Sequence, residues 1–241
     1  MFSYTDISLQ EIPGEISLVL YTGTCPCRCP WCFNSDLLDK KPLSFKQMKD
    51  AIQEHDDFIT AVVLSGGEPL NNPFLIKIIK YCKDKGLKVK LNTNGLVDDN
   101  LKKNIFLPYV DYMNISLKGI RMNYDYILKS PKVHPCTPLC NTLEYSFVYS
   151  RNIWPDVYLK LFRDFLLNKI SFDWSTAFSY KWSQPDIFTV SQVQVGNCLN
   201  PQYNDCNVPT ESECIEVAKM FKDIPKKKLI VETKEFGRKS I

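Results

Sequence analysis

Residues 15–32 read EISLVLYTGTCPCRCPWC, a strand-like run followed at once by a loop that holds four cysteines. Residues 15–21 are mostly β-branched or apolar and lie between Gly14 and Gly23, which is the pattern of a buried strand. Cysteines so close together do not easily satisfy the geometry of a disulfide. The loop therefore predicts ligation of a metal ion or of an iron–sulfur cluster.

The rest of the chain alternates strand-like and helix-like segments. Further strands are expected at residues 59–65, 87–92, 111–117, 143–149, 187–195 and 229–233. Helices are expected at residues 44–55, 72–86, 98–106, 156–168 and 210–222. Such alternation predicts an α/β fold of parallel strands, either an open sheet or a partial barrel. In both cases the ligand site belongs at the carboxyl ends of the strands.

Several residues mark where these elements begin and end. Ser44 and Gln47 have the spacing of a capping box at the start of the first helix. Asn72 is the expected N-cap of the second helix, and Gly86 is expected to close it. Residues 121–142, rich in proline and tyrosine, are expected to form an irregular excursion over the barrel mouth. The apolar face expected of the helix at 156–168 includes Val157, Leu161 and Phe165.

Length and composition limit the classes of function. A chain of 241 residues with 44% hydrophobic and 24% charged residues is typical of one soluble globular domain. The net charge of +3 is too small to indicate nucleic acid or a membrane as a partner, and no apolar run approaches the roughly 20 residues of a membrane span. The first 15 residues lack the pattern of a signal peptide. We therefore expect a cytoplasmic protein, in which cysteine thiols stay reduced.

The spacing within the cysteine loop favours a cluster with one open iron. Cys25, Cys29 and Cys32 follow the pattern C-x3-C-x2-C, with Trp31 just before the last cysteine. Three thiolates can bind three irons of a [4Fe–4S] cube and leave the fourth open, whereas a fully ligated electron-transfer cluster would need a fourth cysteine. The alternative is a structural zinc site that uses all four cysteines, Cys27 included.

Two further motifs follow the next two expected strands. Residues 65–69 read SGGEP and residues 93–95 read TNG. Together with the cysteine loop, they resemble the motifs of the radical S-adenosylmethionine (radical SAM) superfamily. The resemblance implies a partial (βα)6 barrel of the TIM-like, radical SAM type, formed as a single domain by residues 1–241. Residues 14–120 would bind the cluster and S-adenosylmethionine, and residues 143–241 would form the second half of the barrel.

The resemblance also implies the roles of the site residues. Cys25, Cys29 and Cys32 would be the catalytic cluster ligands. The residues implied in binding S-adenosylmethionine are Trp31, Gly66, Gly67, Glu68, Pro69, Asn94, Ser116 and Lys118. The two glycines would let backbone groups approach the methionine end, Glu68 would accept from its ammonium group, and Trp31 would lie near the adenine through its backbone. Reductive cleavage at the [4Fe–4S] cluster would then give a 5′-deoxyadenosyl radical that abstracts a hydrogen atom.

Within the superfamily, the chain is most similar to activating enzymes of glycyl-radical enzymes, particularly that of the class III ribonucleotide reductase. Residues 15–38, 191–201 and 231–237 carry this likeness. It implies an oxidoreductase that takes hydrogen from a glycine of a partner glycyl-radical enzyme, with a flavodoxin- or ferredoxin-type reductant. One departure is that Ser116 stands where these activases often have the aspartate of an Asp-x-Lys pair, while Lys118 keeps the lysine.

The sequence leaves other functions and a further cofactor open. The enzyme could act on a small molecule or on a nucleotide or tRNA base, or the chain could be a non-catalytic iron–sulfur electron carrier. Five later cysteines could bind an auxiliary cluster or be separate buried thiols, as Cys82 is expected to be on its helix. These five are Cys136, Cys140, Cys198, Cys206 and Cys214.

Overall fold

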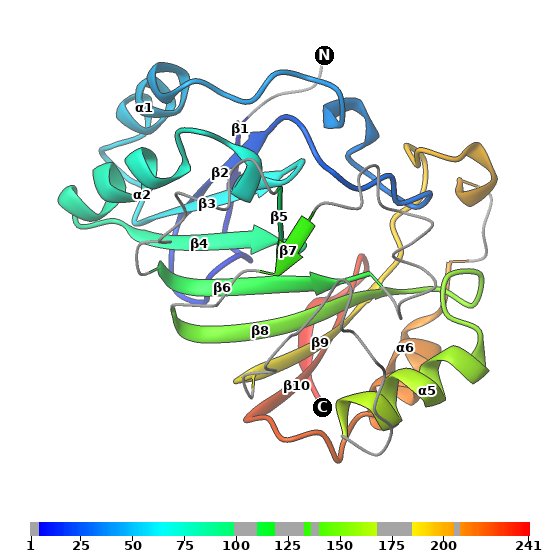
Figure 1. Ribbon diagram of the computed structural model, residues 1–241. Helices are drawn as coiled ribbons and strands as arrows, with labels where there is room; N and C mark the ends of the chain where they lie inside the picture. Colours follow the sequence, from blue (N-terminus) through cyan, green and yellow to red (C-terminus); the bar gives the residue numbers. More distant parts are fainter. Residues whose placement is uncertain (1–4, 99–109, 119–132, 136–139, 168–184, 205–207) are drawn as a thin grey trace. The chain divides into compact units, whose positions relative to one another are not determined.

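The computed structural model describes residues 5–98, 110–118, 133–135, 140–167, 185–204 and 208–241 (Figure 1). The chain divides into two compact units, each described here by itself. Unit 1 contains residues 1–26, 36–115 and 132–143, and unit 2 contains residues 27–35, 116–131 and 144–241. The expectation that residues 1–241 form a single radical SAM domain stays a prediction.

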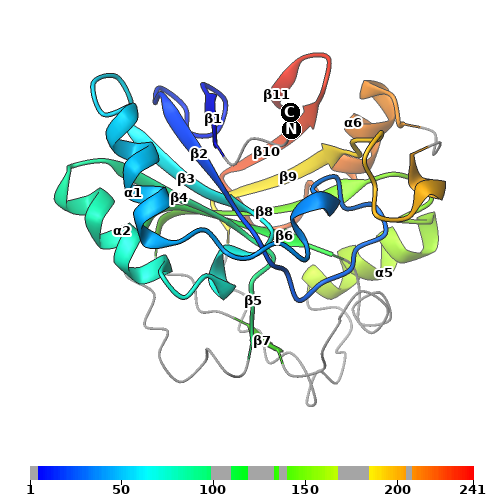
Figure 2. The ribbon, with the colours of Figure 1, turned by 90° about the horizontal axis from the view of Figure 1, so that it is seen from above.

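Unit 1 is built on a largely parallel sheet. Its strands, in their order across the sheet, are β1 (Thr5–Ser8), β2 (Ser17–Thr22), β3 (Ala61–Gly66), β4 (Lys88–Thr93) and β6 (Val110–Leu117), of which residues 110–115 belong to this unit. β1 pairs antiparallel with β2, and the other neighbours pair in parallel. Figures 1 and 2 show α1 (Phe45–Glu54) and α2 (Leu75–Asp84) on the same side of β2, β3 and β4. A short antiparallel pair, β5 (Leu96–Asp98) and β7 (Val133–Pro135), completes the unit.

The ends of these two helices agree with the sequence at two positions and differ at one. Gly86 closes α2 as expected, directly after the C-cap Lys85 and with φ +76°. Ser44 caps α1 as expected, because its side chain accepts from the Gln47 amide and the Gln47 side chain accepts from the Ser44 amide. Asn72 is not the N-cap of α2, which begins after Phe74. Instead, Asn72 Oδ1 accepts from the Phe74 amide at 2.8 Å, and Asn72 Nδ2 donates to the Leu43 carbonyl at 3.0 Å. Asn72 thus shapes the turn into the helix rather than capping it.

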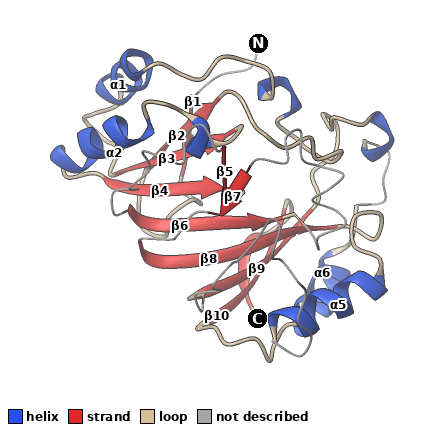
Figure 3. Cartoon of the chain, viewed as in Figure 1, coloured by secondary structure: helices blue, strands red, loops and turns tan. Residues whose placement is uncertain are grey.

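Unit 2 contains mainly parallel strands and two helices. Its strands are β8 (Cys140–Tyr149, of which residues 144–149 belong to this unit), β9 (Ile187–Gln192), β10 (Lys228–Thr233) and the antiparallel β11 (Gly237–Ser240), in that order. Figure 3 shows the helices α5 (Asp156–Leu166) and α6 (Glu211–Lys219) of this unit. The core between sheet and helices is aromatic: Phe147 of β8 lies within 6 Å of the rings of Trp154, Phe162, Phe188 and Phe221.

The apolar face expected for α5 is wrong. Val157 is 58% exposed and Leu161 is only half-buried, whereas Leu159 and Phe162 are buried. The Phe162 ring packs on Trp154 at 4.9 Å between centroids, and this contact fixes the rotation of the helix about its axis. The position of that aromatic cluster cannot be seen from helical periodicity alone. Phe165 lies outside the side chains that the structure describes.

Four short strands were not expected from the sequence. β1 and β11 are antiparallel edge strands, and β5 pairs with β7. Because β7 and the start of β8 lie within residues 121–142, the irregular excursion expected there is interrupted by regular structure at residues 133–135 and from residue 140. Residues 99–109, which hold most of the helix expected at 98–106, lie outside the described residues. No helix among the described residues is long and apolar enough to cross a membrane.

The packing of α5 gives a direct test of this part of the fold. Leu159→Ala removes a fully buried side chain and should lower the free energy of unfolding by about 2–5 kcal/mol. Val157→Ala, on the exposed face of the same helix, should change it by no more than about 0.5 kcal/mol. Urea unfolding followed by circular dichroism measures both. Equal losses in the two variants would contradict the observed rotation of the helix.

Candidate functional site

Two turns in unit 1 are joined by one buried carboxylate. Glu68 follows β3, and Thr93 and Asn94 lie at the end of β4. Glu68 Oε1 accepts from Thr93 Oγ1 at 2.5 Å and from the Leu70 amide at 3.0 Å, and Oε2 accepts from the Asn94 amide at 2.8 Å. Glu68 is 1% exposed. Its carboxylate therefore holds the SGGEP and TNG turns together, a role of Thr93 that the sequence did not reveal although the residue belongs to the second motif.

The two glycines before Glu68 are required by the protein's own backbone. Gly66 has φ +106°, a conformation that other residues rarely adopt. A Cβ at Gly67 would lie 2.2 Å from the Thr24 carbonyl oxygen. The Gly67 amide donates to the Thr22 carbonyl at 2.8 Å, and the Glu68 amide donates to the Thr24 carbonyl at 2.7 Å. The turn after β3 is thus packed directly on the chain that leaves β2, immediately before the cysteine loop.

Asn94 connects this pair of turns to the first cysteine of the loop. Its side-chain Nδ2 donates to Cys25 Sγ at 3.7 Å, and its Oδ1 accepts from the Leu96 amide at 2.8 Å. Both Asn94 and Cys25 are buried. Hydrogen bonds to cysteine sulfur are among the features that tune iron–sulfur clusters. The structure thus brings together two site residues that the sequence proposed from separate motifs.

In unit 2, the second half of the loop holds an acidified thiol. The Cys32 amide donates to the Cys29 carbonyl at 2.9 Å, which closes a tight turn between these two cysteines. A hydrogen bond with the Cys27 side chain lowers the pKa of Cys29 to about 7; burial opposes this shift, and the positive charge of Lys118 adds to it. Lys118 Nζ in turn donates to Ser116 Oγ at 2.8 Å. Because the thiolate is the form that binds metals, these surroundings prepare Cys29 for ligation.

The donor atoms that the cysteine loop offers are four thiols. Cys25, Cys27, Cys29 and Cys32 are all free of disulfides. Among the residues that the structure describes, no three His, Cys, Asp or Glu side chains form a group that could hold one metal ion. A zinc site needs its ligands to converge on a single point, whereas each thiolate of a [4Fe–4S] cluster binds its own iron. The donor chemistry of the loop thus fits a [4Fe–4S] cluster, and the choice of Cys25, Cys29 and Cys32 over a four-cysteine zinc site stays a prediction.

The remaining predicted cofactor residues have structural contacts of their own. The Trp31 ring packs against the Tyr203 ring, with centroids 6.1 Å apart, and Trp31 is 9% exposed. Its indole is thus anchored in unit 2, and its backbone contact with adenine stays a prediction. Pro69 is buried in the first position of a short 3-10 helix, Pro69–Asn71, for which Glu68 is the cap.

The later cysteines that can be described are mostly buried thiols. Burial raises the pKa of Cys82 to about 12 and that of Cys214 to about 11, so both are poor ligands. Cys198 is also buried and donates to the Gln194 carbonyl at 3.5 Å. Cys82 is the buried thiol that its helix predicted. Cys140 is half-buried, and Cys136 and Cys206 lie outside the described residues, so the auxiliary cluster stays a hypothesis that the raised pKa of Cys214 does not support.

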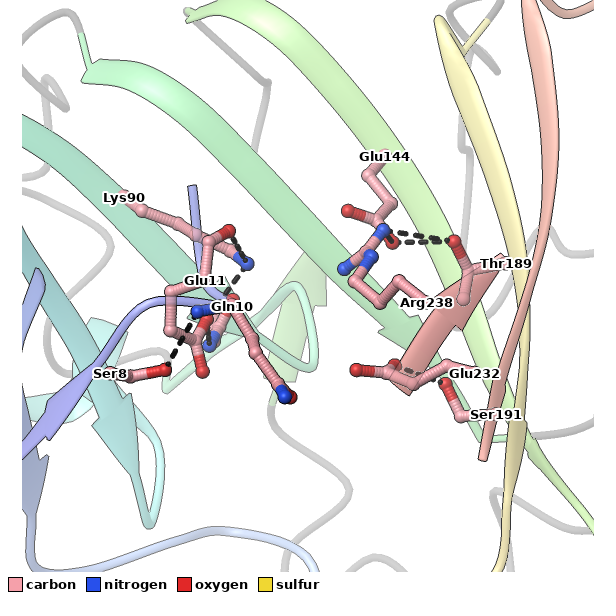
Figure 4. Close-up of polar contacts among 10 residues, drawn as sticks. Ser8, Gln10, Glu11, Lys90, Glu144, Thr189, Ser191, Glu232 and Arg238 are labelled. Carbon is pink, nitrogen blue, oxygen red and sulfur yellow. Dashed lines mark hydrogen bonds and ion pairs between the residues drawn. The ribbon is translucent and has the colours of Figure 1, made fainter. Parts of the chain in front are cut away.

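Each unit also carries a charged pair on its sheet (Figure 4). In unit 1, Lys90 Nζ lies 2.8 Å from Glu11 Oε2, and the Lys90 side chain is 2% exposed. In unit 2, Arg238 of β11 lies 2.5 Å from Glu144, whose side chain is fully buried, and Thr189 Oγ1 also donates to Glu144 at 2.5 Å. Thr189 alternates with Phe188, which packs on Phe221 after α6, so this pair lies on the sheet face away from the helices.

Comparison with known proteins agrees with these motifs. Residues 19–135 match the sequence model of the Radical SAM superfamily. A Methanocaldococcus jannaschii protein, named as a glycyl-radical enzyme activating enzyme, is 32% identical over 118 residues, 47% of this chain and 48% of the relative. The PqqA peptide cyclase of Methylorubrum populi is 30% identical over 114 residues, 45% of this chain and 30% of that enzyme. The chain thus matches about half or less of the length of these curated relatives.

Solved structures show the same fold. SuiB of Streptococcus suis, bound to S-adenosylmethionine, has a TM-score of 0.53 and 14% identity, covering 90% of this chain and 49% of that chain. At this identity the likeness concerns the fold alone. Together with the family match of residues 19–135 and the parallel strands and flanking helices of both units, it confirms the α/β fold of the radical SAM type.

The bridging role of Glu68 can be tested by measuring the free energy of unfolding of its variants. Glu68→Gln places an amide group where the carboxylate accepts from Thr93, Leu70 and Asn94, so at least one donor loses its acceptor. We expect the free energy of unfolding of the apo-protein to fall by about 1–3 kcal/mol, as measured in urea. In the matched variant Thr93→Val, only the hydroxyl is lost, and the effects of the two substitutions should not add. An unchanged stability of Glu68→Gln would contradict the bridging role.

Proposed function

Because the chain carries a radical SAM domain, a type that uses a [4Fe–4S] cluster and S-adenosylmethionine, we propose that Cys25, Cys29 and Cys32 bind the cluster in an enzyme that abstracts hydrogen from a polypeptide. When bound, the reduced cluster supplies the electron that cleaves S-adenosylmethionine to the 5′-deoxyadenosyl radical. The single observation that carries the proposal is a chain of two hydrogen bonds. The Asn94 amide donates to Glu68 and the Asn94 side chain donates to the Cys25 sulfur, which links the three motifs.

The chain's own residues divide the work of holding the cluster. Asn94 donates to Cys25 and so stabilises negative charge on that sulfur. The Cys27 side chain and the charge of Lys118 favour the thiolate of Cys29 at neutral pH. Cys32 follows in the same tight turn as Cys29. We assign Cys27 a supporting role, since it acts on Cys29 by a hydrogen bond and stands outside the C-x3-C-x2-C pattern.

The same turns offer a site for the cofactor's methionine end. Gly66 and Gly67 keep this segment free of side chains, so that backbone groups can bind the amino acid part of S-adenosylmethionine. Glu68 acts in this proposal first as a positioning residue, because its contacts hold the SGGEP and TNG turns in register. Its bond to the ammonium group, and the roles of Trp31, Pro69, Ser116 and Lys118 toward the cofactor, remain part of the proposal.

The names of two relatives support a polypeptide substrate, whereas a third, the Fe-coproporphyrin III synthase of Methanosarcina barkeri (32% identical over 108 residues), is named for a small molecule. The first two are named for activating glycyl-radical enzymes and for cyclising the PqqA peptide, and both names refer to polypeptides. We propose a glycine of a partner glycyl-radical enzyme as the hydrogen donor, with a flavodoxin- or ferredoxin-type protein as the reductant. The departure at Ser116 is compatible with this, since Ser116 still pairs with Lys118 as the aspartate of an Asp-x-Lys pair would.

A matched pair of cysteine variants tests the cleavage of S-adenosylmethionine. Anaerobically reconstituted, dithionite-reduced protein should form 5′-deoxyadenosine from S-adenosylmethionine, as followed by chromatography. Cys29→Ala should lose the cluster's electron paramagnetic resonance signal and all product. Cys27→Ala should keep the cluster, because its thiol serves only as a hydrogen-bond partner. Loss of the cluster in both variants would favour a four-cysteine site.

The class of substrate needs a second readout. Incubation with a class III ribonucleotide reductase should give a glycyl-radical resonance on that polypeptide, in step with deoxyadenosine formation. Deoxyadenosine without any radical on the polypeptide would favour a small molecule or a nucleotide base. A cluster signal that ignores S-adenosylmethionine, with no binding of the cofactor, would instead indicate an electron carrier.

A further inference from the structure

Residues 196–203, here called the clamp segment, lie against the cysteine loop within unit 2. The segment follows β9 and is more than 160 positions away from the loop along the chain. Asn197 Nδ2 donates to the Phe33 carbonyl at 3.0 Å, and Ser35 Oγ donates to the Asn197 carbonyl at 3.0 Å. The Asn200 amide donates to the Pro30 carbonyl at 2.9 Å. The clamp segment therefore binds the loop on both sides of Cys32.

An aromatic contact extends the same attachment. The Tyr203 ring packs on the Trp31 ring at 6.1 Å between centroids, with the planes 50° apart. Contacts thus fall on residues 30, 31, 33 and 35 of the loop, which flank Cys32 and immediately follow Cys29. Rotation of the loop's backbone would move both thiols, so holding these carbonyl groups holds the sulfur atoms.

Hydrogen bonds within and next to the clamp segment also fix its own conformation. Asn204 Oδ1 accepts from the Gly196 amide at 3.2 Å and from the Cys198 amide at 2.7 Å. The Asn200 side chain accepts from the Gln202 amide at 3.0 Å and caps a short 3-10 turn. A segment that is fixed by its own side chains can position a neighbour, because little further ordering is required when the two meet.

We propose that Asn197 is a positioning residue for the cluster. It acts by fixing the backbone of the loop between Cys29 and Ser35. Its two contacts with the loop use both polar ends of the residue, the side-chain amide toward Phe33 and the main-chain carbonyl toward Ser35. The inference rests on the proposed function, in which Cys29 and Cys32 bind iron. It adds a part of the chain outside residues 19–135, the range of the family match.

The nature of the Asn197 contact decides which variant is informative. Asn197→Asp keeps the shape of the side chain but replaces the donor with an acceptor that faces the Phe33 carbonyl. Ser35→Ala removes the second contact by deleting only a hydroxyl. Gln202→Ala is the matched control, since this side chain is exposed in the same segment. Thermal unfolding by circular dichroism should show little change in all three, because the Asn197–Phe33 contact is exposed and the Ser35–Asn197 contact is only part-buried.

The first readout uses apo-protein and does not depend on the cluster. Alkylation of Cys29 and Cys32 by iodoacetamide, followed by peptide mass spectrometry, reports how often the loop opens. We expect alkylation in Asn197→Asp to be about five- to tenfold faster than in the parent chain, the factor that one lost hydrogen bond corresponds to. Ser35→Ala should show a smaller increase, and Gln202→Ala should match the parent. Equal rates in Asn197→Asp and the parent would overturn the inference.

The second readout uses the reconstituted holoprotein. Iron release to a chelator should be faster in Asn197→Asp by a similar factor, and the resonance of the reduced cluster should change in shape, while Gln202→Ala matches the parent in both. A parent protein that binds no cluster would refute the proposed function. If the parent protein binds a cluster, and Asn197→Asp has the same iron-release rate and the same resonance signal as the parent, the positioning role alone is refuted.

Discussion

The buried carboxylate of Glu68 is the interaction on which the arrangement of unit 1 depends. It accepts from both the side chain at the end of β4 and the backbone that follows it, while its own backbone amide donates to the residue that precedes the cysteine loop. Three successive strand ends are thereby connected through one residue. Without these contacts of Glu68, Asn94 would not be held within hydrogen-bond distance of the Cys25 sulfur. The glycine turn would also not be held so close to Thr24.

A second principle is that hydrogen bonds from the protein act on each cysteine differently. Cys25 receives an amide donor, whereas Cys29 is acidified by a neighbouring thiol and by a lysine. Cys82 and Cys214, which lie on helices, are instead made less acidic, mainly by burial and in Cys214 also by the charges of Glu213 and Glu235. The chain thus separates ligand thiols from structural thiols through their local surroundings, although all of them are largely hidden from solvent.

The sequence was informative where a feature is local. Strand runs bounded by glycine, the capping box at Ser44 and the motifs at strand ends were all placed correctly, because each depends on neighbours a few positions away. It failed where a distant partner decides. The buried face of α5 follows from the Phe147 cluster, and the role of Thr93 follows from a carboxylate 25 positions earlier. The contacts of Asn197 with the cysteine loop could not be read from either segment alone.

The charged pairs on the two sheets have a practical consequence for handling the chain. Glu11 lies in the connection between the first two strands, and Arg238 lies in the last strand, so each pair is completed by a residue near one end of the chain. Removing the N-terminal residues up to Glu11 would leave Lys90 buried without its counter-ion, and removing the last strand with Arg238 would do the same to Glu144. An unpaired buried charge destabilises a protein by about 3–5 kcal/mol, a large part of the stability of a typical domain. A minimal cluster-binding fragment is therefore a poor substitute for the intact chain.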